Sequence, residues 1–290
     1  MTPARAGLTA ALLSCALAGG MRAAHAAAAD SAPARAGADV PLPSLAALSS
    51  LSGREIQERV LANRFDSFVQ TASMVSGDRA EREQLTRVEM WYRDLRGRDG
   101  GDPATLSKTI VHYTHPIELH RSGYLVIHRR DAPDDQFVYR ASTRRIQRVN
   151  LRRQAVFGTD FSFEDLIPPE IDDFVYRRAS DLDWEGRPVL VIEARPRADS
   201  DSAYAKIESW VDAERFVPLR ARYWDRHDIE IKELRVEPES VERFDDVWVP
   251  RRSTMHDLRS GGYTRLHVEE LLPNAELPRS VFDVRRLELR

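Results

Sequence analysis

Most of the chain alternates between apolar and polar residues with a period of two, and no other feature constrains its fold as strongly. The alternation begins after Phe65 and continues almost to the end of the 290 residues. In residues 84–95, Val88, Met90 and Tyr92 share one face of an extended chain, whereas arginine and glutamate side chains occupy the other. This pattern is typical of antiparallel strands that turn one face to water.

The predicted strands follow one another with short connections that carry turn-forming residues, such as Asp99-Gly100-Gly101 and Gly261-Gly262. They cover residues 67–76, 84–95, 106–115, 124–130, 136–141, 145–150, 174–183, 188–195, 205–212, 217–224, 229–236, 240–249, 251–257 and 263–271. A meander of this kind predicts a mainly β fold with a curved antiparallel sheet, rather than parallel strands joined by helices.

Only two segments have helical character, and both are short. Ser52 and Glu55 have the spacing of a capping box ahead of an amphipathic stretch at residues 53–65, and residues 160–167 form the second candidate. Two short helices cannot cover one face of so large a sheet. Either the sheet wraps on itself, or its concave side stays partly open to an apolar ligand.

The first residues have the features of an export signal. Arg5 precedes an apolar stretch that ends near Ala24-His25-Ala26, a small-x-small cleavage pattern. We therefore expect a signal peptide at residues 1–26, a disordered leader at 27–51 that is rich in alanine and proline, and a single folded domain at 52–290. In a minor alternative, Cys15 carries a lipid and anchors the protein to a membrane.

The charge balance argues against nucleic acid as a partner. Removing residues 1–26, which contain Arg5 and Arg22 but no acid, takes the formal net charge from −3 to −5. Both signs are mixed along almost every segment, which indicates a solvated surface rather than a phosphate-binding stripe.

Four motifs occur in an order and spacing that resemble one family. They are FGTDFSFEDL at residues 157–166, the preceding arginine-rich hairpin at 137–149, the Trp-Val-Asp hairpin at 210–225, and the Leu-Pro-x-x-x-Phe segment at 277–282. Together they resemble the outer-membrane lipoprotein-sorting family (LolA/LolB-like superfamily), in its divergent periplasmic branch.

The resemblance implies an incomplete, or half, β-barrel with a few short helices that cover its concave side. It also implies a monomeric periplasmic carrier for lipid, an acylated protein or another hydrophobic cargo, served by an inner-membrane transporter. It implies no catalysis and no cofactor. The alternative is an accessory module that docks on an envelope transporter of the RND type and carries nothing.

The candidate cargo-binding residues are apolar side chains expected on the concave face. They are Val88, Met90, Tyr92, Leu190, Ile192, Ile207, Val211, Leu219 and Tyr223. The aromatic residues expected to form a lid over this face are Phe157, Phe161 and Phe163. The alternatives are that the aliphatic residues only fill a core and that the aromatic residues only fix their loop to the sheet.

Acidic and basic residues near the lid allow two interpretations each. Asp160, Glu164 and Asp165 either cap a short helix that starts near Ser162 or contact a partner. A group of arginines either binds lipid phosphates or an acidic transporter surface, or forms a solvated strand edge. This arginine group consists of Arg140, Arg144, Arg145, Arg148, Arg152 and Arg153.

Histidines are the residues that most invite an enzymatic hypothesis. His112, His115 and His120 fall in one predicted hairpin, and His128 follows, but their spacing lacks the H-E-x-x-H form of a zinc site. The sequence also contains no G-x-S-x-G elbow, no phosphate-binding loop and no dinucleotide fingerprint. We therefore expect neither an enzyme nor a metal site.

Overall fold

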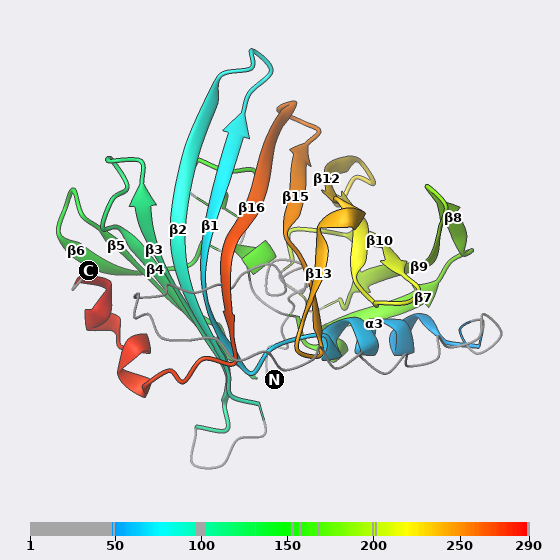
Figure 1. Cartoon of the computed structure of the whole chain (residues 1–290), viewed down its shortest axis with the longest axis horizontal. Coiled ribbons are helices and arrows are strands. Elements are labelled where there is room, and N and C mark those ends of the chain that lie inside the picture. Colours follow the sequence, from blue (N-terminus) through cyan, green and yellow to red (C-terminus); the bar gives the residue numbers. More distant parts are fainter. Residues whose placement is uncertain are drawn as a thin grey trace, which may run out of the picture.

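The computed structural model describes residues 48, 50–96, 102–130, 132–151, 154–156, 158–166, 169–198, 200 and 202–288. One large antiparallel sheet dominates this part of the chain (Figure 1). Its strands are β1 (Ser67–Gly77), β2 (Glu83–Asp94), β3 (Thr105–His115), β4 (Gly123–Arg129), β5 (Asp135–Arg140), β6 (Arg145–Val149), β7 (Phe174–Arg178), β8 (Leu182–Trp184), β9 (Arg187–Pro196), β10 (Lys206–Asp212), β11 (Pro218–Trp224), β12 (Glu230–Val236), β15 (Arg252–Asp257) and β16 (Gly262–Pro273). A separate hairpin consists of β13 (Val241–Phe244) and β14 (Val247–Pro250).

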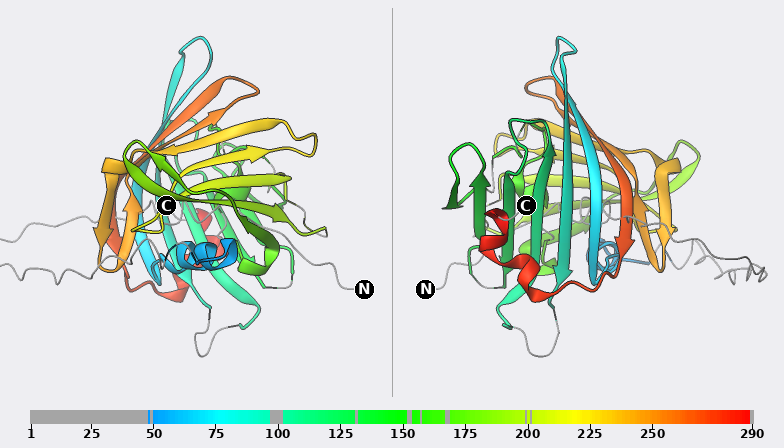
Figure 2. Two further views of the ribbon diagram at one scale, coloured as in Figure 1. Left: turned by 90° about the vertical axis from the view of Figure 1, so that its right-hand side faces the viewer. Right: turned by 60° about the vertical axis from the view of Figure 1, so that its left-hand side comes forward.

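The first and last of these strands pair with each other in the middle of the sheet. One half of the sheet runs from β1 through β2, β3, β4 and β5 to β6. The other half runs from β16 through β15, β12, β11, β10 and β9 to β7, with β8 beside β9. The sheet does not close, since β6 and β7 lie at opposite ends of this order, and it is strongly curved (Figure 2). The predicted incomplete barrel is confirmed.

The main hydrophobic core lies on the concave face of this sheet. It contains alternate residues of neighbouring strands, such as Phe68 of β1, Val88 of β2 and Val111 of β3, together with Tyr223 of β11. The β13–β14 hairpin adds Val247 and Val249 to the same core. The period of two in the sequence is thus the period at which side chains enter this core.

Helix α3 (Gly53–Ala62) packs on β7 and β9 at one end of the concave side. Its predicted capping box is present, since the Ser52 side chain accepts a hydrogen bond from the Glu55 N–H and the Glu55 carboxylate accepts one from the Ser52 N–H. A Cβ at Gly53 would lie only 2.7 Å from the backbone of Arg177, so only glycine allows this close approach.

The folded part was predicted to start at Ser52, but residues ahead of Ser52 also contact it. Leu48 is buried beside α3, and the Arg178 guanidinium donates to the carbonyl oxygens of Leu48 and Leu51. The predicted signal peptide at residues 1–26 lies outside the described residues. Among the helices that are described, none has the length and apolarity needed to cross a membrane.

Part of the outer face of β2–β6 is not left to water as the alternation predicts. Trp91, Ile110 and Leu125 point outward from β2, β3 and β4 and are buried beneath the C-terminal segment. This segment forms two 3-10 helices, η4 (Arg279–Phe282) and η5 (Val284–Glu288), which insert Phe282 and Leu287 between the outward residues. The C-terminal segment therefore covers part of the outer face of this half, beside β3–β6 (Figure 2).

Two of the predicted strands were wrong, because the structure has two separate strands in place of each one. Residues 174–183 are divided into β7 and β8, and residues 240–249 into β13 and β14 with a turn at Asp245. Asp245 adopts a φ of 51°, so an aspartate takes the left-handed conformation for which glycine is the usual signal. The remaining 3-10 helices are η1 (Phe163–Leu166), η2 (Ile171–Asp173) and η3 (Pro238–Ser240).

The C-terminal cover makes a testable contribution to stability. We expect Phe282→Ala to lower the free energy of unfolding by about 3–5 kcal/mol, because it leaves a cavity over Trp91 and Leu125. Urea denaturation followed by Trp fluorescence measures this loss. Val175→Ala, at a side chain that is 57% exposed, is the control and should change the free energy of unfolding by less than about 0.5 kcal/mol. A loss below about 1 kcal/mol for Phe282→Ala would mean that the segment is not fastened by this ring.

Candidate functional site

A loop between β6 and β7 enters the concave side of the sheet. We call its described residues, 154–156 and 158–166, the plug. The Val156 N–H donates to the Phe161 carbonyl (2.7 Å) and the Phe163 N–H donates to the Gln154 carbonyl (2.9 Å), so the two arms of the plug hold each other. Gly158 provides the bend between them with a φ of +71°.

Two aromatic side chains of the plug are seated in the main core. Phe161 and Phe163 are only 2% and 1% exposed and contact the same cluster as the concave residues of β1–β5. The ring of Phe163 lies 4.5 Å from that of Tyr124 of β4, measured between centroids. The plug therefore fills part of the concave side with its own aromatic side chains.

Buried carboxylates fasten the plug to the opposite half of the sheet. Glu164 is fully buried and accepts hydrogen bonds from the Ser202 hydroxyl (2.6 Å) and the Ala203 N–H (2.9 Å). Asp165 accepts a hydrogen bond from the Tyr204 hydroxyl (3.0 Å) and lies 3.6 Å from the Lys232 ammonium. These contacts are hydrogen bonds and one ion pair. If the plug moved out, water could take the place of the partners that the two carboxylates lose.

The two carboxylates that hold the plug also shift the pKa of the neighbouring tyrosines. Burial raises the pKa of Tyr204 well above its usual value, and the carboxylates of Asp165 and Glu164 raise it further. The pKa of Tyr223 is raised by the same causes. Both phenols therefore stay protonated at neutral pH, and Tyr204 remains a hydrogen-bond donor to Asp165.

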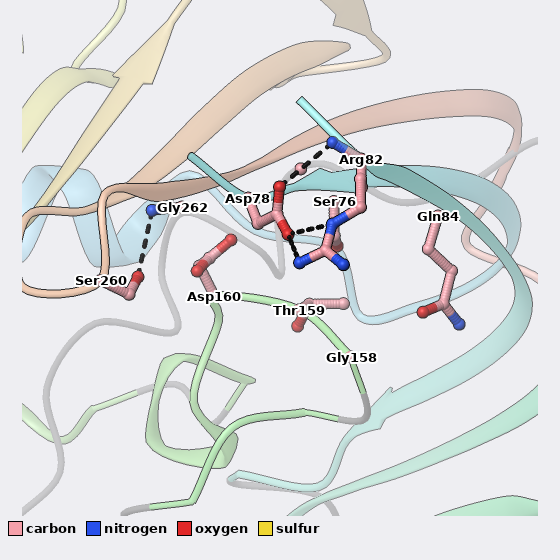
Figure 3. Close-up of a pocket in the computed structure, with 10 residues that line it drawn as sticks. Ser76, Asp78, Arg82, Gln84, Gly158, Thr159, Asp160, Ser260 and Gly262 are labelled. Atoms are coloured by element: carbon pink, nitrogen blue, oxygen red, sulfur yellow. Dashed lines mark hydrogen bonds and ion pairs between the residues drawn. The ribbon is translucent and has the colours of Figure 1, made fainter. Parts of the chain in front are cut away.

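Asp160 connects the plug to the rim of the sheet. Its carboxylate accepts a hydrogen bond from the Thr264 hydroxyl of β16 (2.6 Å), and its N–H donates to the same oxygen (2.9 Å). Asp160 also lines a polar pocket of about 270 Å³ with residues of the β1–β2 and β15–β16 turns, where Asp78 and Arg82 form an ion pair (Figure 3). Burial raises the pKa of Asp160, while the Thr264 hydroxyl opposes this shift.

The predicted acidic roles at the plug are met in part. Asp165 acts as a cap, because its carboxylate accepts the Ser162 N–H (2.7 Å) at the start of η1. Glu164 instead reaches across to residues 202–203, and Asp160 reaches to β16. No pattern in the sequence indicates these partners, since the pairs lie 38 and 104 residues apart.

The structure divides the predicted cargo-binding residues among three clusters, and none of them is more than 6% exposed. Val88, Met90, Tyr92, Ile207 and Tyr223 share the main core with the plug aromatics. Leu190, Ile192 and Val211 form a second cluster under α3, and Leu219 belongs to a third cluster with Val217 and Val236. Of the predicted lid residues, Phe161 and Phe163 lie together, whereas Phe157 lies outside the described residues.

The described members of the predicted arginine group have different surroundings. Arg140 and Arg145, with Thr143 and Gln147, line an exposed cavity of about 360 Å³ on the β5–β6 hairpin. Arg148 is instead paired with Asp135. Arg152 and Arg153 fall outside the described residues, and both interpretations of the group stay open.

The predicted hairpin histidines do not converge on a metal site. Within the described part of the chain, no three His, Cys, Asp or Glu side chains are arranged so as to hold a metal ion. His128 instead contacts the Asp134 carboxylate through Nδ1 (2.8 Å), and the ring of His112 packs edge-on against Trp91. Both histidines have structural neighbours that account for their burial.

The raised pKa of Asp160 predicts a pH dependence of stability. Below the unfolded pKa of about 3.9 the carboxyl is protonated in both states and contributes no difference. As pH rises through the raised folded pKa, ionisation costs more in the folded state, so the folded state loses stability. The free energy of unfolding of Asp160→Asn, relative to that of wild type, should therefore increase as the pH rises from 3 to 7. Urea denaturation at several pH values measures this difference.

A second variant tests the cause of that shift. Thr264→Val removes the hydroxyl that favours the ionised form of Asp160, so its stability should fall more steeply with pH than that of wild type. If the difference in free energy of unfolding between Asp160→Asn and wild type is the same at every pH in this range, the ionised Asp160 is not destabilised by burial.

Comparison with known proteins identifies relatives of this fold. A family model described as "Uncharacterized protein" matches residues 105–289. A search of curated proteins finds no significant match. Among solved structures, the chain is similar to a putative outer membrane lipoprotein-sorting protein domain from Vibrio parahaemolyticus, with 21% identity and a TM-score of 0.72, over 81% of this chain and 98% of that one.

Two further structures give the same result. A DUF1329 family protein from Desulfovibrio piger is 20% identical with a TM-score of 0.74, and the match covers 81% of this chain and 97% of that one. The LolA superfamily protein NE2245 from Nitrosomonas europaea is 19% identical with a TM-score of 0.62, over 81% and 98% of the two chains. The predicted LolA/LolB-like fold is confirmed, and the chain belongs to the family whose model, described as "Uncharacterized protein", matches residues 105–289.

Proposed function

We propose that the protein is a periplasmic carrier that holds a hydrophobic cargo, such as lipid or the acyl chains of a lipoprotein, on the concave face of its half-barrel. The observation that carries this proposal is the plug. Phe161 and Phe163 occupy an apolar face on which an acyl chain would fit, while the fastening of the plug to residues 202–204 is polar and reversible.

The free energies involved allow cargo to displace the plug. Withdrawing two buried phenylalanine side chains into water costs about 3–6 kcal/mol. An acyl chain of about 14 methylenes gains about 11 kcal/mol when it is buried. Cargo can therefore pay for opening the plug, and the plug can cover the apolar face again after the cargo leaves.

Export through residues 1–26, binding as a monomer and delivery of cargo by an inner-membrane transporter belong to the same proposal. The fold of the chain is that of lipoprotein-sorting and LolA superfamily proteins, and this supports a carrier rather than an enzyme. A carrier of this kind needs no catalytic group, because transfer depends only on the relative affinities of donor, carrier and acceptor for the cargo.

A second function is favoured by a separate observation. All nine predicted cargo-binding residues are packed against side chains of the chain itself. A module that docks on an envelope transporter and carries nothing would have such a filled concave side. The two functions differ in whether the plug opens to a ligand.

Loosening the plug separates the two functions. Phe163→Ala removes about 1.5–3 kcal/mol from the closed state, which raises the open fraction about ten- to a hundredfold. If the protein is a carrier, its affinity for a fluorescent long-chain acyl probe should rise by a similar factor. Detergent-free native mass spectrometry of the mature protein should also detect a bound lipid.

Phe282→Ala is the matched control, because it removes an equally buried ring from the outer face of the sheet. It should lower stability without raising the affinity for the probe. If Phe163→Ala and Phe282→Ala take up the probe equally weakly and the wild-type mass shows no lipid, the docking module is the better account.

A further inference from the structure

The concave face contains a polar side chain that the apolar core does not explain. Gln70 lies on β1 in the middle of the sheet, opposite Met90 of β2 and Leu271 of β16. By alternation along β1 it faces the same side as Phe68 and Ala72, which belong to the main core. Gln70 itself is fully buried.

Neither amide atom of Gln70 has a hydrogen-bond partner within the part of the chain that the structure describes. A carboxamide can donate two hydrogen bonds and accept two, and a buried polar group without a partner is unusual because its desolvation is not compensated. A leucine would fill this position at lower cost if packing were the only requirement.

The same face contains a second polar group of this kind. Thr86 of β2 is 1% exposed, and its hydroxyl also has no partner among the described residues. It shares its side of β2 with Val88 and Met90, and it lies about 13 Å along the strand from the level of Gln70, at about 3.3 Å per residue. Two such groups on one face favour a role for that face beyond packing.

We infer that Gln70 binds the carbonyl group of the cargo. The cargo is then an acyl ester or amide whose carbonyl oxygen accepts a hydrogen bond from the Gln70 amide, rather than a plain hydrocarbon. This inference rests on the proposed carrier function, since a docking module would never present a ligand to Gln70. It explains why the concave face keeps, at the centre of the sheet, a carboxamide with no hydrogen-bond partner among the described residues.

Gln136 provides a matched control on the same face. It is 3% exposed and lies two residues before Val138, so both side chains face the main core. Unlike Gln70, it has a partner, because its side-chain oxygen accepts a hydrogen bond from the Leu151 N–H (3.0 Å). Gln136→Leu therefore removes a glutamine whose role is structural. It should lower the melting temperature, whereas Gln70→Leu should leave it unchanged or raise it.

The experiment compares two fluorescent probes of similar length, of which only one has an ester. 1-Hexylpyrene is a pure hydrocarbon, and the methyl ester of pyrenebutyric acid carries the same fluorophore on a chain of the same length that includes one carbonyl. We expect Gln70→Leu to weaken binding of the ester about five- to tenfold relative to wild type while leaving binding of hexylpyrene unchanged. Gln136→Leu should keep the wild-type ratio of the two affinities.

The outcomes separate this inference from the proposed function. If both probes bind and Gln70→Leu changes neither affinity, the carrier function stands and the role of Gln70 is overturned. If neither probe binds to wild type or to Phe163→Ala, the carrier function itself fails. Equal losses for both probes in Gln70→Leu would also overturn the inference, because they would indicate a general change in the concave face.

Discussion

The pairing of β1 with β16 is the contact on which the rest of the structure depends. It extends from Phe68 opposite Pro273 to Gly77 opposite Tyr263, and it joins the two halves of the sheet. Without it each half would be a separate open sheet with a long unpaired edge. Because the halves are joined, one concave face runs from β5 to β10, and a single core can form on it.

The plug combines two kinds of contact that respond differently to water. Its phenylalanines are held by burial, whereas Glu164 and Asp165 are held by hydrogen bonds and by the nearby charge of Lys232. Exposure costs the aromatic rings free energy, but water can compensate the carboxylates for the partners they lose. In the proposed carrier, an apolar ligand would therefore compete mainly with the burial of the rings.

Much of the fold could be predicted from the sequence because it depends on local periodicity. The alternation located nearly every strand, and the Ser52–Glu55 spacing located the start of α3. The turn at Asp245 was missed because an aspartate there adopts the conformation usually signalled by glycine. The C-terminal cover was missed because the alternation of β2 assigns the outer face of the sheet to water, although Trp91 is buried there.

The candidate site was less predictable because its contacts join residues that are distant in the sequence. Phe161 and Phe163 were recognised by their spacing, but the partners of Glu164 and Asp165 come from residues 202–204 and from Lys232, which only the tertiary fold brings near. Gln70 gave no signal at all. A glutamine in an alternating strand looks the same in sequence whether or not its amide has a partner.

The joining of β1 to β16 also governs when the molecule can form. The hydrogen bond from Ser67 to the carbonyl of Ala275 links residues that are 208 positions apart. At about 5–20 residues per second, a ribosome needs about 10–40 s to make the chain between them. For that time one edge of the central strand has no neighbour. While that edge is unpaired, another copy of the chain can pair with it, and a more stable finished molecule would not remove this exposure.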